Sequence, residues 1–72
     1  MDAQNNLGAL YSFGQGVPQD YIEAHFHFNL AASSGNQTAI SNRNNTAEKM
    51  TPADTSIAQK RSRKWLKKYR KK

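Results

Sequence analysis

The sequence predicts an all-α fold in which an αα-hairpin repeat is closed by a C-terminal capping helix. Three observations support this prediction. Apolar and small residues recur at helical spacing on both sides of residues 14–19. Those intervening residues are rich in glycine and proline and indicate a turn. A helix start signal, Thr51-Pro52, then opens the last segment of the chain.

The segment before the turn is predicted to form the first helix of the hairpin. Apolar residues at intervals of three and four fall on one helical face; they are Ala3, Leu7, Leu10 and Tyr11. Gly8 lies among them and would let a second helix approach closely. Leu7, Leu10 and Tyr11 would have no preceding repeat to cover their outer side.

The turn excludes one continuous helix, because Gly14, Gly16 and Pro18 lie close together. Glycine tolerates a positive φ, whereas proline fixes φ and lacks the N–H donor. Asp20 is expected to cap the second helix, and the Glu23 side chain is expected to reach back to the amide of Asp20.

The second helix of the hairpin is predicted from residues that share one face. These residues are Ala24, Phe28, Ala31 and Ala32. The small members allow close approach, and Phe28 fills the remaining space together with Leu7 and Tyr11. Gly35 stands where a left-handed residue commonly ends a helix.

Residues 1–35 resemble the Sel-one-like repeat (SLR), a relative of the tetratricopeptide repeat (TPR). The matching positions are Ala3, Leu7, Gly8, Tyr11, Gly14, Gly16, Val17, Asp20, Ala24, Phe28, Ala31, Ala32, Gly35 and Ala39. Ala39 follows Ala3 at the period of that family. His27 departs from the pattern, since the repeat usually carries tryptophan or another aromatic residue there. The resemblance implies a fragment of a helical-repeat solenoid, with residues 1–35 as one complete hairpin.

Residues 36–50 correspond to a degenerate first helix of a second repeat. Helical spacing is kept by Ala39, Arg43 through its aliphatic stem, Ala47 and Met50. Helix formation is opposed by Asn42, Asn44, Asn45 and Thr46, whose side chains compete for backbone hydrogen bonds. Arg43 replaces the leucine of the repeat, and Asn44 replaces its glycine.

Residues 51–72 are predicted to form the capping helix and a basic tail. Thr51 is the expected cap, Pro52 the first helical residue, and Asp54 an acid near the positive end of the helix dipole. The stripe expected to dock on the hairpin is Ala58, Ser62, Trp65 and Tyr69, flanked by Ile57 and Leu66. Met50, Thr51-Pro52 and Trp65 resemble the segment that closes SLR arrays.

The charge is concentrated at the C-terminal end. Residues 60–72 hold nine lysines and arginines and no acid, whereas residues 1–59 carry a net charge of −3, which gives the chain +6. These cations can be a solvated helix face. As an alternative function, the segment 60–72 could bind nucleic acid or an anionic membrane surface. The candidate anion-binding residues are Lys60, Arg61, Arg63, Lys64, Lys67, Lys68 and Arg70.

No catalytic, metal or cofactor site is expected. His25 and His27 are two residues apart and point about 200° away from each other on a helix. One is expected to be solvated, and the other to pack at the aromatic position of the repeat. Gly14-Gln15-Gly16 lacks the third glycine and the preceding strand of a dinucleotide motif. We therefore expect a protein that is not an enzyme.

The chain of 72 residues has no cysteine, so no disulfide can support its small core. Because about three stacked repeats are usually needed for stability, we expect a fragment of a longer array, or association with another copy or a partner. Neither a signal peptide nor an apolar membrane-spanning run is visible. These absences favour the cytoplasm, with a secreted or periplasmic location left open for a fragment.

The family resemblance implies a protein–protein interaction module, an adaptor or scaffold that holds an unidentified partner protein in a concave groove. The first helices of the hairpins line that groove in the family. The candidate groove residues here are Gln4, Asn5, Ser12, Gln37, Ser41 and Asn45. The fold alone does not name the partner.

Overall fold

The computed structural model describes residues 3–16 and 18–70, with Tyr69 and Arg70 described by their backbone only. These residues form four helices, which are α1 (Ala3–Phe13), α2 (Tyr21–Ser33), α3 (Gln37–Ala47) and α4 (Pro52–Arg70). The all-α fold is therefore confirmed. The expectations for Val17, for the side chains of Tyr69 and Arg70, and for residues 71–72 lie outside the described part of the chain.

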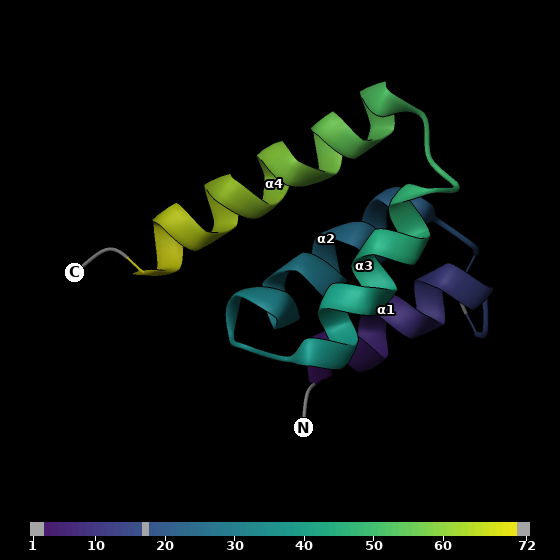
Figure 1. Cartoon of the computed structure of the whole chain (residues 1–72), viewed down its shortest axis with the longest axis horizontal. Coiled ribbons are helices and arrows are strands. Elements are labelled where there is room, and N and C mark those ends of the chain that lie inside the picture. The colour runs from purple at the N-terminus through teal and green to yellow at the C-terminus, as the bar shows by residue number, and fades with distance from the viewer. Residues whose placement is uncertain (1–2, 17, 71–72) are drawn as a thin grey trace.

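Helix α2 is the centre of the fold, because α1, α3 and α4 each pack against it. Figure 1 shows α4 as a long rod above the other three helices, with α1 and α3 on the opposite side of α2. The core accordingly draws mainly on α2, which buries Phe26, Phe28 and Leu30.

The turn between α1 and α2 follows the glycine and cap signals of the sequence. Gly14 and Gly16 have φ of 70° and 80°, values that favour glycine. The Asp20 carboxylate accepts hydrogen bonds from the amides of Ile22 at 3.1 Å and Glu23 at 3.2 Å. Asp20 therefore caps α2, as predicted.

The predicted return of the Glu23 side chain to the cap is wrong. The amide of Asp20 donates instead to the carbonyl of Tyr11, at 2.9 Å. With that donor already satisfied, the Glu23 carboxylate is available to pair with Arg61 of α4, at 2.9 Å. The ion pair with Arg61 thus takes the place of the bond from the Glu23 side chain to the Asp20 amide that a capping box would contain.

The close approach of α1 and α2 depends on Gly8. A Cβ atom at this position would lie 2.5 Å from Cδ1 of Phe28, well inside van der Waals contact. Phe28 itself is only 2% exposed. Ala24 and Ala31 on the same helix are also buried, as the spacing predicted. Leu7, which was expected to help fill this contact, is instead 38% exposed.

Helix α3 forms despite its asparagines. Gly35, with a φ of 93°, ends α2, and the Asn36 side chain accepts a hydrogen bond from the Ala39 amide at 2.9 Å. Thr46, expected to oppose the helix, is 3% exposed and donates its hydroxyl to the Asn42 carbonyl at 2.8 Å. Packing against α2 therefore overrides the weak helix propensity of this segment.

Helix α4 begins at the predicted signal and docks through small side chains. The amide of Asp54 donates to the Thr51 hydroxyl at 3.1 Å. Ala58 and Ser62 are fully buried, and α4 packs on α2. Arg61 adds a contact over the Phe26 ring, with its guanidinium carbon 4.5 Å from the ring centroid.

Several large apolar side chains remain at the surface. Trp65, expected to dock on the hairpin, is 37% exposed, although it lies on the same stripe of α4 as the fully buried Ala58 and Ser62. Ile57 on the same helix is 47% exposed. Leu7 and Leu10 on α1 are also exposed, and no described element covers the outer side of this helix.

Candidate functional site

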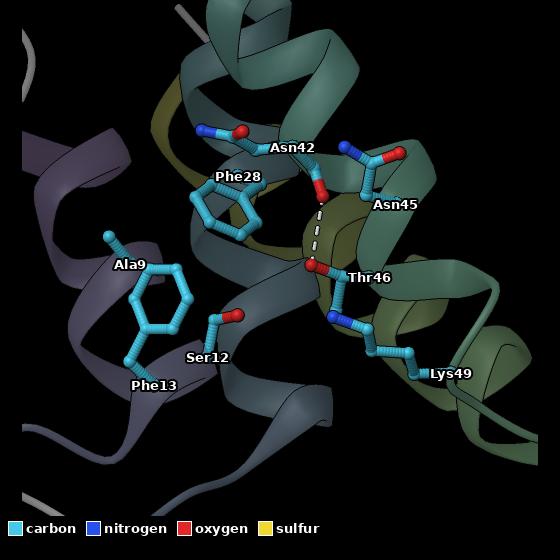
Figure 2. A pocket seen from close by; sticks show the side chains of 8 residues that line it. All are labelled: Ala9, Ser12, Phe13, Phe28, Asn42, Asn45, Thr46 and Lys49. Atoms are coloured by element: carbon cyan, nitrogen blue, oxygen red, sulfur yellow. Dashed lines mark hydrogen bonds between the residues drawn. The ribbon is translucent and has the colours of Figure 1, made fainter.

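A pocket of about 150 Å³ lies between α1 and α3. Figure 2 shows the side chains that line it, contributed by α1, α2, α3 and the turn after α3. They are Ala9, Ser12, Phe13, Phe28, Asn42, Asn45, Thr46 and Lys49. We call this hollow the α1/α3 groove.

The groove combines apolar walls with polar groups. Phe28, which is nearly fully buried, forms its inner wall, and Phe13 on its rim is 69% exposed. Thr46 and Asn42 lie four residues apart on α3 and share a hydrogen bond. Ser12, Asn45 and Lys49 add a hydroxyl, an amide and an ammonium group to the lining. Such a mixture can bind a segment with both apolar and hydrogen-bonding groups.

The six predicted groove residues fall into three pairs. Ser12 and Asn45 both line the α1/α3 groove, from opposite helices. Gln37 and Ser41 are exposed on α3 and are not part of the lining. Gln4 and Asn5 are half-buried and make internal contacts.

The contacts of Gln4 and Asn5 hold neighbouring helices together. The Gln4 Oε1 atom lies 2.6 Å from Nδ1 of His27 on α2. The Asn42 amide donates to Asn5 Oδ1 at 3.2 Å, which links α3 to α1. Their polar groups therefore position the walls of the groove in this structure.

Four polar or aromatic residues of the lining were missed from the sequence: Phe13, Asn42, Thr46 and Lys49. Asn42, Thr46 and Lys49 follow one another at intervals of four and three, which is the spacing of a single helical face. Asn42 and Thr46 were read only for their propensity against helix. Their spacing relative to Asn45 and Lys49 could have revealed the groove side of α3.

Neither histidine is solvated, so the expectation that one of them would be is wrong. His25 is 2% exposed, and its Nδ1 atom has no hydrogen-bond partner. His27 stacks on Tyr11, with the ring centroids 5.6 Å apart, and so takes the aromatic position of the repeat.

Both histidines are held towards their neutral form. Burial lowers the pKa of His25, and the positive charge of Arg43 lowers it further. Burial also lowers the pKa of His27, against the opposing effect of the Glu23 carboxylate. Within residues 3–16 and 18–70, no group of three or more His, Cys, Asp or Glu side chains could hold a metal ion.

The candidate anion-binding residues lie along α4. Lys60, Arg63, Lys64, Lys67 and Lys68 are exposed. Arg61 is instead engaged with Glu23 and Phe26, and the side chain of Arg70 lies outside the described residues. Among the helices that the structure describes, none has the length and apolar character needed to cross a membrane.

The fold and the Gly8–Phe28 contact place this chain in the class of αα-hairpin repeat proteins. A family model described as Sel1 repeat matches residues 2–36, so this part of the chain is similar to a Sel1 repeat. Sel1 repeats generally mediate protein–protein interactions and are not catalytic modules. Comparisons with curated proteins and with solved structures found no match.

Proposed function

We propose that this protein is a non-catalytic interaction module that binds a peptide segment of another protein in the α1/α3 groove. The observation that carries the proposal is the groove itself, which Ser12 of α1, Asn45 of α3 and the Phe28 ring of α2 line together. The Sel1 repeat supports the general class of function.

The chemistry of the lining suits an extended peptide. The Asn45 amide and the Ser12 hydroxyl offer both donors and acceptors to a peptide backbone, which carries the complementary groups. Phe13 and Phe28 offer apolar contact to one side chain of the ligand. The exposed Phe13 ring is the expected anchor, since aromatic residues dominate the energetics of such contacts.

A displayed library of random peptides tests this proposal. Selected peptides are synthesised, and their dissociation constants for the full chain are measured by fluorescence anisotropy. We expect Phe13→Ala and Asn45→Ala each to weaken binding at least about tenfold, the size of a contact worth more than 1 kcal/mol. Gln37→Ala is the matched control, because Gln37 lies on α3 outside the lining and should leave affinity unchanged.

Nuclear magnetic resonance provides the second measurement. Titration with a selected peptide should shift the amide signals of Ser12, Asn45 and Lys49 in the groove. If the shifts fell instead on α4, or if all three variants bound the peptides equally, the groove would not be the binding site.

A further inference from the structure

From Lys60 onwards, the described side chains on the outward face of α4 are all cations. With about 100° of rotation per residue, the exposed side chains of Lys60, Arg63, Lys64, Lys67 and Lys68 cover an arc of roughly 140° around the helix. The centre of this arc lies opposite Ala58 and Ser62, which are buried. We call these five residues the α4 cationic face.

No acid of α4 balances this face. Asp54 is the only acidic residue of the helix, and it lies in the first turn, before the cations begin. Glu23 of α2 reaches α4 but pairs with Arg61, which is not part of the face. A solvated helix face usually mixes both signs of charge, so this face is complementary to a polyanion.

The width of this arc favours a polyanion with a groove, such as duplex DNA, over a flat anionic surface. A flat surface contacts only the centre of a helix, near Lys60 and Lys67, whereas Arg63 and Lys68 lie on opposite flanks. The major groove of duplex DNA admits one α-helix and has phosphates along both walls. Cations on both flanks can therefore contact both strands.

The apolar residues of α4 do not form a membrane-binding face. Ala58 and Ser62 face α2 and are buried within the protein. The exposed Ile57 and Trp65 are eight positions apart, or about 12 Å along the helix. An interfacial helix needs a continuous apolar face, which α4 does not offer to a bilayer.

From this arrangement we infer that α4 binds double-stranded DNA through its phosphates, without reading the base sequence. The helix is held from behind by α2, as Arg61 and the buried Ser62 show. Its exposed side carries the lysines and the arginine of the α4 cationic face. This site is separate from the α1/α3 groove, so either proposal can fail without the other.

Binding of a labelled duplex of about 20 base pairs, two helical turns, tests the inference by fluorescence anisotropy over a salt series. If about five phosphates are neutralised, the logarithm of the association constant should fall with that of the salt concentration with a slope of about −4 to −5. Affinity should then drop several hundredfold between about 50 and 200 mM salt.

Charge variants locate the contact. Lys60→Gln, Lys64→Gln and Lys67→Gln combined should make the salt slope less steep by about three units. The same three positions changed to arginine should keep the slope, because the positive charge and not the lysine side chain itself makes the phosphate contact. Lys49→Gln removes a cation of the α1/α3 groove and should leave the slope unchanged.

Two other anionic ligands test whether α4 prefers duplex DNA. Vesicles containing phosphatidylserine and a single strand of equal length are measured under the same conditions. Tighter binding to either one than to the duplex would overturn the inference. So would an absence of duplex binding at low salt, or an unchanged slope in the triple glutamine variant.

Discussion

At the scale of single residues, His25 combines burial with an unpaired polar atom. Its side chain is 2% exposed, its Nδ1 atom has no partner, and Arg43 adds an unfavourable positive charge. A buried unpaired polar atom costs free energy even when neutral. Protonation would add an uncompensated charge, so this residue makes the fold sensitive to acid.

We predict that the free energy of unfolding rises with pH between about 5 and 7. The pKa of His25 and of His27 is lowered in the folded state, so the unfolded chain binds protons more strongly below its ordinary histidine pKa of about 6.5. Stability is therefore fully present above that value and is lost as the pH falls towards the lower folded pKa. The slope is at most about 1.4 kcal/mol per pH unit for each histidine.

Urea unfolding at a series of pH values, with His25→Leu as the variant, measures this effect. The variant should show a smaller pH dependence, because only His27 still contributes. A wild-type stability that did not change between pH 5 and 7, or a variant with the full slope, would contradict the account.

At the scale of elements, the attachment of α4 to α2 depends on Arg61. This residue forms the 2.9 Å ion pair with Glu23 and lies over the buried Phe26 ring. Arg63, two positions later, is exposed and belongs to the α4 cationic face. The two arginines therefore form a natural pair of test and control.

We predict that Arg61→Ala lowers the free energy of unfolding by about 1 kcal/mol, the combined size of a partly exposed ion pair and a cation–π contact. Arg63→Ala should stay within about 0.5 kcal/mol of the wild type. Urea unfolding measures both, and about 1 M salt should narrow the difference by screening the ion pair. Equal effects of the two substitutions would refute the assigned role of Arg61.

Local signals explain which parts of the fold could be predicted. Gly14, Gly16 and Asp20 act within a few residues of their own position, so the turn and the start of α2 were readable from the sequence. The pairing of Glu23 with Arg61 was not readable, because the two residues lie far apart in the chain.

The same limit applies to the candidate groove. Ser12 and Asn45 were readable as polar residues on the expected groove side of the helices, and both line the pocket. The internal bonds of Gln4 and Asn5 depend on how α1 sits against α2 and α3, which spacing alone does not specify. The partial exposure of Trp65 was likewise not readable, because spacing does not specify how far along α4 the packing on α2 extends.

At the scale of the whole molecule, helix α2 packs against each of the other three helices. Because α2 contacts the other three helices, removing α4 would uncover one side of the core. A domain of 72 residues has little stability to lose, commonly no more than about 3–5 kcal/mol. Cooperative folding should therefore require α4 up to its buried contacts and no further.

We predict that a chain truncated after Leu66 keeps a cooperative urea transition, because Ala58 and Ser62 remain. A chain truncated after Met50 should lose this transition and much of its helical circular dichroism. Sedimentation equilibrium of the full chain supplies the companion measurement for the predicted self-association. Loss of the cooperative transition in the chain that ends at Leu66 would show that residues 67–72 have a structural role.

Phe28 gives the architecture and the candidate recognition site a common origin. One part of its ring lies against the bare backbone of Gly8, and the ring also lines the α1/α3 groove. A substitution of Phe28 would therefore change both the distance between α1 and α2 and the shape of the α1/α3 groove. Substitutions that change ligand preference should therefore leave the hairpin intact only at the rim, at Phe13 or Asn45, because any change at the Phe28 ring also alters the packing of α1 on α2.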